Sequence, residues 1–224
     1  MSLNSDAERV YEELLTRVGE ATPRPRIEPV RRLAELAGSP QLSFPVIQIA
    51  GTNGKTSTSR AIESLLRAHG LRTGLFTSPH LVEFTERFQL DGTAISGEDL
   101  AAAWAELQAP LEIVDTELQA AGQGPITFFE ALAVLAFTAF ADAPVDVAVI
   151  EVGMGGEWDA TNIGSAQVAV FTPVDLAHTA SLGNDIATIA RTKAGIVKPN
   201  AVVVSAPQHE AALGELADVA AARR

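Results

Sequence analysis

The fold is decided by the stretch Pro45-Val-Ile-Gln-Ile-Ala50, which runs directly into Gly51-Thr-Asn-Gly-Lys-Thr-Ser57. The apolar run predicts a buried strand, and the glycines that follow predict a tight loop. The segment 55–69 is expected to be a helix that is closed by Gly70. A strand, a glycine loop and a helix N-terminus in this order direct successive backbone N–H groups toward one point, which suits a phosphate.

The loop also carries the side chains of a nucleotide site. Lys55 can bridge phosphates, and the hydroxyl of Thr56 or Ser57 can reach Mg²⁺. The loop departs from the strict G-x-x-x-x-G-K-[ST] pattern because Ile49 occupies the first glycine position. The competing interpretation is an ordinary Gly/Asn turn before a helix. The predicted ATP-binding residues are Gly51, Thr52, Asn53, Gly54, Lys55, Thr56 and Ser57.

Outward from the loop, strands alternate with helices along the chain. Further helices are expected at 6–18, 30–37, 97–121, 127–141, 186–196 and 210–224. Further strands are expected at 71–77, 145–151, 167–172 and 201–205, with a strand and turn at 84–95. The strands are continuous apolar runs rather than alternating ones, and this is typical of a parallel sheet buried on both faces. We therefore expect an α/β fold of the P-loop type, with a mostly parallel sheet covered by helices on both faces.

Composition narrows the class of protein. The chain is 47% hydrophobic and 20% charged, as in globular proteins, and it has no cysteine for a disulfide, a thiolate metal site or a nucleophile. Its net charge of −12 argues against a nucleic-acid partner. Residues 1–9 lack a secretory signal, and the longest apolar run, 131–141, is too short to span a bilayer. A cytoplasmic protein without a membrane partner is expected.

A second candidate site begins at Glu151-Val-Gly-Met-Gly-Gly156, directly after the predicted strand 145–151. A carboxylate at the C-terminal end of a parallel strand lies where open α/β sheets bind ligands, and it suits Mg²⁺. Ser78 and His178 follow two other strands and are expected at the same edge. The alternatives are a solvated glutamate and a packed histidine.

Lysine is rare in this chain, with three lysines against thirteen arginines. Two of the three, Lys55 and Lys193, lie in motifs, where an ammonium or a free amine could not be replaced by a guanidinium. Lys193 would by default be a surface lysine on a helix. Its apolar neighbours, Ala194 and Ile196, instead predict burial, which would lower the pKa of its amine and make it nucleophilic.

Taken in order, these stretches resemble the folylpolyglutamate synthase family, including its bifunctional dihydrofolate synthase form, within the Mur ligase superfamily. The resemblance covers roughly Arg26 to Pro199. The phosphate loop alone would fit any Mur-type ligase, whereas the motifs at 77–81, 127–130 and 159–162 narrow it to the folate branch. The matching stretches are Gly51-Thr-Asn-Gly-Lys55, Gly74-Leu-Phe-Thr-Ser-Pro-His-Leu81, Phe84-Thr-Glu-Arg87, Thr127-Phe-Phe-Glu130, Val149-Ile-Glu-Val-Gly-Met-Gly-Gly156, Asp159-Ala-Thr-Asn162, His178 with Leu182-Gly183, and Lys193-Ala-Gly-Ile196.

The resemblance implies an ATP-dependent ligase that joins L-glutamate to folate or to dihydropteroate through an acyl phosphate. It implies ATP and Mg²⁺ as cofactors, with Mn²⁺ as a substitute, and a monomer in the full-length form. In that family an N-terminal ATPase domain precedes a smaller C-terminal domain. This chain is therefore expected to be the ATP-binding domain over 1–224, with a helical lead-in at 1–44 and a sheet core at 45–205, truncated before the C-terminal domain and inactive alone.

Roles for single residues follow from the same resemblance. Catalytic roles fall on Lys55, Lys193 and His178, and Lys193 matches a lysine that becomes carbamylated and helps to hold a second metal ion. The implied metal ligands are Thr56, Ser78, Glu151 and His178. The implied substrate-binding residues, which line the pterin pocket, are Thr127, Phe128, Phe129, Glu130, Trp158, Asp159 and Ala160.

The chain departs from the family pattern at three positions. Ala177 replaces the Asp that commonly precedes the metal-binding His, Glu157 replaces an Arg, and Thr192 replaces a Glu. Two other functions stay open: a Mur-type ligase with another acceptor, which a pterin-binding assay would distinguish, and a non-catalytic nucleotide-binding module. Ala177 and the expected absence of a C-terminal domain favour the second of these.

Overall fold

The computed structural model describes residues 5–19, 24–177 and 179–223, and within them a single sheet has the strand order β4-β3-β2-β5-β1-β6-β7. β2, β5, β1, β6 and β7 are parallel, whereas β3 and β4 form an antiparallel hairpin at one edge. The predicted α/β fold is confirmed. The strands are β1 (Val46–Ala50), β2 (Thr73–Phe76), β3 (Phe88–Leu90), β4 (Thr93–Ala94), β5 (Val147–Glu151), β6 (Ala166–Phe171) and β7 (Val202–Ser205).

β1 lies inside the sheet, paired with β5 on one side and β6 on the other. Its register aligns Ile49 with Glu151 and Ala50 with Phe171. The residues that follow β1, β5 and β2 therefore meet at the carboxyl edge of the sheet, where open parallel sheets bind ligands.

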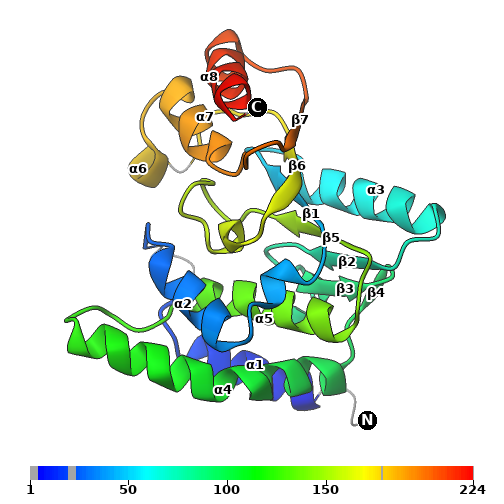
Figure 1. Cartoon of the computed structure of the whole chain (residues 1–224), viewed down its shortest axis with the longest axis vertical. Coiled ribbons are helices and arrows are strands. Elements are labelled where there is room, and N and C mark those ends of the chain that lie inside the picture. The colour runs from blue at the N-terminus through cyan, green and yellow to red at the C-terminus, as the bar shows by residue number, and fades with distance from the viewer. Residues whose placement is uncertain (1–4, 20–23, 178, 224) are drawn as a thin grey trace.

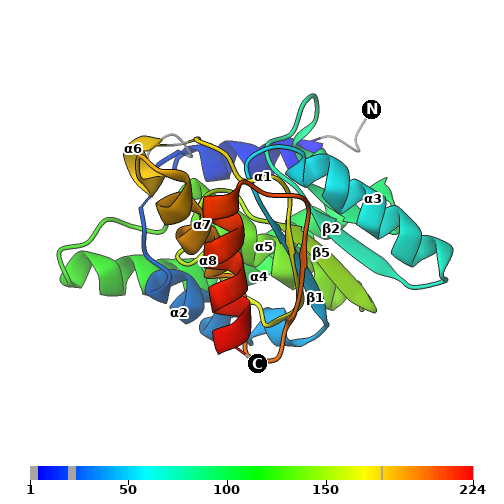
Figure 2. The ribbon, with the colours of Figure 1, turned by 90° about the horizontal axis from the view of Figure 1, so that it is seen from above.

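Helices cover both faces of the sheet, as Figures 1 and 2 show. α5 packs on one face, with α1, α2 and α4 outside it, and α7 and α8 cover the β6–β7 end of the same face. On the opposite face, α3 is the one helix that the described residues provide. The helices are α1 (Ser5–Leu15), α2 (Glu28–Leu36), α3 (Lys55–Ala68), α4 (Gly97–Ala120), α5 (Phe128–Asp142), α6 (Thr179–Leu182), α7 (Ile186–Ala194) and α8 (Glu210–Ala222), with 3-10 turns η1 (Pro40–Leu42), η2 (Phe84–Arg87) and η3 (Ala160–Ile163).

α5 is apolar around its whole circumference because it lies between two layers. It packs on the sheet on one side and on α4 and α1 on the other, and nearly all of its residues are buried. A helix in this position has no solvent-facing side and so needs no polar stripe. The lead-in helices α1 and α2 belong to the same core, through Val10, Leu14, Val30 and Leu33.

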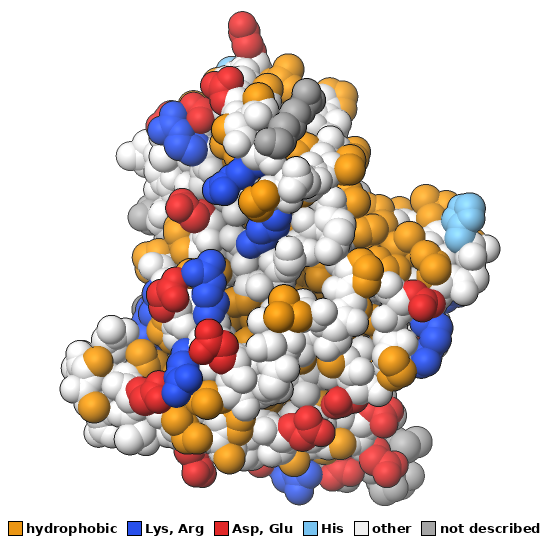
Figure 3. All heavy atoms as spheres, viewed as in Figure 1, with side chains coloured by type: hydrophobic (Ala, Val, Ile, Leu, Met, Phe, Trp, Pro, Cys, Tyr) orange, Lys and Arg blue, Asp and Glu red, His pale blue; other side chains and the backbone are white. Residues whose placement is uncertain are grey.

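The face that carries α3 is covered only in part by the described residues. Val202 and Val204 of β7 point to this face and are 60% and 49% exposed, while Leu65 of α3 is 64% exposed. Figure 3 shows hydrophobic side chains gathered along α3 and beside it. We call Leu65, Val202 and Val204 the open apolar face.

Most predicted elements agree with the structure to within about three residues at each end. The segment 84–95 differs: it begins with the 3-10 turn η2 and continues as the short hairpin β3–β4, whose turn is at Asp91-Gly92 as expected. Asp91 turns with a positive φ of 50° and accepts a hydrogen bond from Thr73 N, which ties the hairpin to β2.

Candidate functional site

The predicted phosphate loop has the expected local structure. β1 ends at Ala50, and α3 begins at Lys55 after Gly54, whose φ of 81° lies in the left-handed region. Glycine takes this conformation without strain, which allows the chain to turn from strand to helix within a few residues. Thr52 N donates to Pro173 O at 3.0 Å, and Thr52 Oγ1 is 3.0 Å from both Asp175 O and Asp175 N, so the loop is fixed to the segment after β6.

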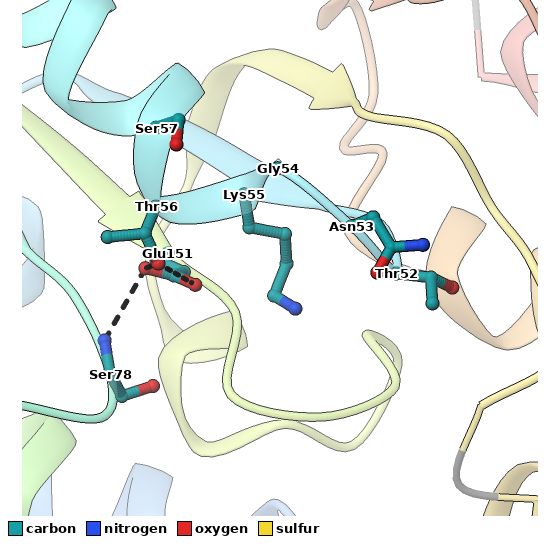
Figure 4. A pocket seen from close by; sticks show the side chains of 8 residues that line it. All are labelled: Thr52, Asn53, Gly54, Lys55, Thr56, Ser57, Ser78 and Glu151. Carbon is teal, nitrogen blue, oxygen red and sulfur yellow. Dashed lines mark hydrogen bonds between the residues drawn. The ribbon is translucent and has the colours of Figure 1, made fainter.

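The loop borders a polar hollow of about 290 Å³ at the carboxyl edge of the sheet. Figure 4 shows the Lys55 side chain extended into this hollow, with Glu151 and Ser78 on one side of it and Thr52 and Asn53 on the other. The structure therefore brings together all of the predicted ATP-binding residues except Gly51, and three of the predicted metal ligands. The lining residues are Thr52, Asn53, Gly54, Lys55, Thr56, Ser57, Ser78 and Glu151.

Glu151 is the central acceptor of the hollow. Its carboxylate accepts hydrogen bonds from Thr56 Oγ1 at 3.0 and 2.9 Å, and from Ser78 N at 3.4 Å. Burial raises the pKa of Glu151, while the Thr56 hydroxyl and the charge of Lys55 act in the opposite direction. A buried carboxylate that faces a hydroxyl and an ammonium is suited to hold a cation beside bound phosphates.

Lys193 is buried, as its apolar neighbours predicted. Only 4% of the residue is exposed, and its Nζ donates to Gly51 O at 2.8 Å. Burial, together with the positive charge of Lys55, lowers the pKa of Lys193 to about 8. Lys193 therefore lies directly behind the start of the phosphate loop.

The two segments predicted to line a pterin pocket lie on either side of the glycine loop 153–156. The Phe129 ring is packed against Gly153, and the Trp158 ring lies close to Gly155. Thr127 and Glu130 form a capping box at the start of α5, and Glu130 is also held by Arg26 Nε and Nη2, each at 2.8 Å. Both segments thus contact the glycine loop that follows Glu151, which is itself a lining residue of the hollow.

Three of the predicted substrate-binding residues point away from open space. Phe128 and Ala160 are 3% and 5% exposed and belong to the main core. Asp159 is 4% exposed, and its carboxylate accepts hydrogen bonds from Met154 N, Thr161 N and Thr161 Oγ1. Phe129 and Trp158 are only partly buried, so they are the members of the two segments that can contact a ligand.

The predicted metal set can be judged only in part, because His178 lies outside the described residues. Among the residues that are described, no three His, Cys, Asp or Glu side chains are grouped so that they could hold a metal ion. The oxygen donors that do converge are Glu151, Thr56 and Ser78.

Comparison with known proteins decides the family. A profile of the Mur ligase middle domain matches residues 49–209. The chain belongs to the Mur ligase family. The matched range holds the phosphate loop, Glu151 and Lys193, so the family assignment rests on the segments that build the hollow.

Relatives of this Mur ligase chain confirm the resemblance to folylpolyglutamate synthases. It is 50% identical over 182 residues to the dihydrofolate synthase/folylpolyglutamate synthase of Mycobacterium tuberculosis, a match that covers 78% of this chain and 37% of the relative. It is 39% identical over 173 residues to the Escherichia coli protein of the same name, covering 77% and 39%. The matched part of the chain thus spans less than half of the length of these relatives.

Solved structures of folylpolyglutamate synthases are also similar to this chain. Mycobacterium tuberculosis folylpolyglutamate synthase with ADP and AMPPCP superposes with a TM-score of 0.89 at 42% identity, covering 98% of this chain and 48% of that one. Escherichia coli FolC with DHPP and ADP gives a TM-score of 0.83 at 35% identity, covering 96% and 49%. Within the described part of this Mur ligase chain, every helix is too short or too polar to cross a membrane.

Sequence reasoning missed the residues that hold the site's segments together. Arg26 and Glu130 are 104 positions apart in the sequence, and no local pattern predicts that they form an ion pair. Thr161 and Asn162 belong to the motif Asp159-Ala-Thr-Asn162, whose resemblance to the family implies no role for these two residues. Both are buried and hydrogen-bonded, and a run of polar residues after a buried strand was the available signal.

Proposed function

We propose that this chain is the nucleotide-binding part of an ATP-dependent ligase that adds L-glutamate to folate, and also to dihydropteroate. The observation that carries the proposal is the hollow in which Lys55 faces Glu151 at the end of β5. The names of the relatives, which are folylpolyglutamate and dihydrofolate synthases, support the choice of acceptor.

The reaction has two steps. The γ-phosphoryl group of ATP passes to the terminal carboxylate of the acceptor, so that the bond to ADP breaks as the acyl phosphate forms. The amine of glutamate then attacks the acyl carbon, and phosphate and a proton leave as the amide forms. Phosphoryl transfer between two anions depends mainly on positioning and charge neutralisation. The backbone amides of the loop and the ammonium of Lys55 supply both.

The donors at the hollow fit Mg²⁺. This ion takes oxygen ligands, and it is usually held by one or two carboxylates together with substrate phosphates. Glu151 offers the carboxylate, and the hydroxyls of Thr56 and Ser78 lie in the same hollow. When bound there, Mg²⁺ or Mn²⁺ would neutralise phosphate charge. The lowered pKa of Lys193 supports the carbamylation that the family resemblance implies, because only the neutral amine reacts.

We further propose that the acceptor lies against Phe129 and Trp158, beside the glycine loop. Partly buried aromatic rings offer a flat apolar surface for a fused heterocycle. We expect glutamate ligation to need the part of the relatives that this chain does not span, because closure around the site protects an acyl phosphate from water. We also propose that the complete enzyme is a cytoplasmic monomer.

Calorimetry with Lys55→Ala tests the nucleotide assignment. The variant removes the ammonium that faces the hollow, so ATP–Mg²⁺ should bind about 10- to 100-fold more weakly, as expected for the loss of a charge-assisted hydrogen bond. Arg9→Ala is the matched control, since it removes an exposed cation that does not line the hollow. Equal affinity in Lys55→Ala and the parent would refute the assignment.

A further inference from the structure

Asn162 joins two segments that border the site. It lies in η3 and is 4% exposed. Its Nδ2 donates to Glu157 O at 2.9 Å and to Gly195 O at 3.1 Å. The first carbonyl ends the glycine loop that begins at Glu151, and the second directly follows α7. One side-chain amide therefore bridges the loop and the helix end.

The two segments also touch without an intervening side chain. Glu157 N donates to Thr192 O at 2.9 Å. Gly195 lies so close to Glu157 that a Cβ at position 195 would overlap the Glu157 backbone and Cβ. The contact therefore depends on glycine at position 195, as is usual where two backbones approach closely.

η3 is itself anchored on both sides. Lys198 Nζ donates to Asn162 O at 2.9 Å, after the end of α7. Gln48 Nε2, in the middle of β1, donates to Thr161 Oγ1 at 3.1 Å. The Asp159 carboxylate holds Met154 N of the glycine loop at 2.8 Å. Asn162 thus occupies a fixed position from which its amide can hold the other two segments.

The side-chain oxygen of Asn162 is buried and has no hydrogen-bond partner. A buried unpaired oxygen costs free energy, and an apolar side chain of similar shape would avoid that cost. A residue that only filled space would therefore not need to be an amide. The two N–H donors of Nδ2 are what this position provides.

We propose that Asn162 is a positioning residue: by joining the glycine loop to the end of α7, it sets the place of Lys193 against the phosphate loop. Lys193 is two residues from Gly195 and reaches Gly51 O at 2.8 Å. If the helix end moved away from Glu157, this contact would open. The join therefore links the strand end that carries Glu151 to the helix that carries Lys193.

Lysine labelling tests the proposal, because the chain has only Lys55, Lys193 and Lys198. The full chain is treated at one fixed pH, in bicarbonate-free buffer, with an amine-reactive acetyl ester, and each lysine is quantified by mass spectrometry. Asn162→Leu removes both donors, while Gly195→Ala keeps them and forces the segments apart. In both variants the labelling rate of Lys193 relative to Lys55 should rise about tenfold, which corresponds to the loss of ordinary hydrogen bonds. Asn184→Ala, at an exposed asparagine, is the matched control and should leave the ratio unchanged.

An unchanged Lys193 to Lys55 ratio in a variant that keeps the parent's circular dichroism would overturn the proposal. An equal rise in the labelling rates of all three lysines would also overturn the proposal, because it would show that the whole fold has become less stable. If Asn162→Leu does not fold, the Lys193 to Lys55 labelling ratio of Gly195→Ala decides whether the proposal holds. A second measurement rests on the proposed function: ATP should bind more weakly to both variants. Failure of the parent to bind ATP would contradict that function, and the labelling would still decide the role of Asn162.

Discussion

At the residue scale, Glu151 and Thr56 show how the hollow is prepared for a cation. The Thr56 hydroxyl donates its one proton to the buried carboxylate and remains within 3.0 Å of both oxygens. A cation that entered between them would replace this proton as the partner of the carboxylate, and both side chains could then offer oxygen lone pairs.

Anomalous scattering from a crystal soaked with ATP and Mn²⁺ tests this arrangement. We expect a manganese peak at about 2.0–2.5 Å from the Glu151 carboxylate, the usual range for such ions and oxygen ligands. Glu151→Gln should lose the peak or shift it toward the phosphates. Glu157→Gln, which changes an exposed carboxylate at the end of the same loop, should keep the peak. A peak more than about 4 Å from Glu151 in the unaltered chain would rule out the metal role.

Lys198 is a partly buried cation that does not line the hollow. Burial and, to a lesser extent, the charges of Arg31 and Arg223 lower its pKa to about 8. Below pH 8 the ammonium is therefore less favourable in the folded chain than in the unfolded one. Between pH 8 and the ordinary value of 10.5 the unfolded chain binds more protons, so the free energy of unfolding rises with pH because of this residue.

Urea unfolding of Lys198→Met at several pH values measures this effect. The parent should gain about 1 kcal/mol more than the variant between pH 8 and 10.5, once solvent screening is allowed for. The difference between parent and variant isolates Lys198 from the other titrating groups. Identical pH dependence in the two proteins would contradict the lowered pKa.

At the scale of elements, the start of α5 depends on contacts with residues far away in the chain. Thr127 and Glu130 cap each other's backbone, and Arg26 holds Glu130 with two nitrogens while binding Gly124 O and Pro125 O. Glu130 is 4% exposed, so its carboxylate relies on these partners. The connector before α2 thereby fixes the helix turn that carries Phe129.

Removing one partner of this ion pair should be costly. Arg26→Met leaves the Glu130 carboxylate buried with only the Thr127 amide, and we expect a loss of about 3 kcal/mol in the free energy of unfolding. The double variant Arg26→Met/Glu130→Gln should recover part of this loss, because the unpaired charge is gone. Arg32→Met breaks the exposed pair with Glu117 and should cost far less, because solvent already screens these two charges. Equal losses in the two single variants, measured by denaturation, would contradict the importance of burial.

The elements were predictable where burial leaves a local pattern. The apolar runs of β1 and β5 and the uniformly apolar α5 are such cases, and so is Lys193, whose neighbours Ala194 and Ile196 are buried. The hairpin after η2 was less predictable because its strands are short and lie at the sheet edge. The hydrogen-bond partners of the buried Asp159 carboxylate were not predictable, because no local pattern shows that Met154 N and Thr161 N donate to it.

At the scale of the whole molecule, the two faces of the sheet differ in their cover. The face with α5, α7 and α8 is closed, whereas the described helices leave Val202 and Val204 open beside α3. β7 is also the last strand in the described sheet, so its outer backbone edge is unpaired there. An apolar edge strand of this kind is a site for self-association.

Light scattering at high protein concentration should reveal this tendency. Val204→Lys places a charge on the open apolar face and should reduce self-association, with less than about 0.5 kcal/mol change in stability. Val203→Lys is the matched control on the same strand: its side chain packs under α8, so it should destabilise the chain by several times as much. If Val204→Lys self-associates as strongly as the parent, the open apolar face is not the surface through which the chains associate.

The contrast between α3 and α5 has a consequence for motion. In α3 only Ser59 and Glu63 are buried, whereas α5 is enclosed along nearly its whole length. The backbone amides of α3 should therefore exchange with deuterium quickly, through local opening. Those of α5 should exchange only when the whole domain unfolds, and so much more slowly. α5, whose first turn carries Phe129, would then be nearly static, whereas α3, which begins at Lys55 in the lining of the hollow, would open locally and often.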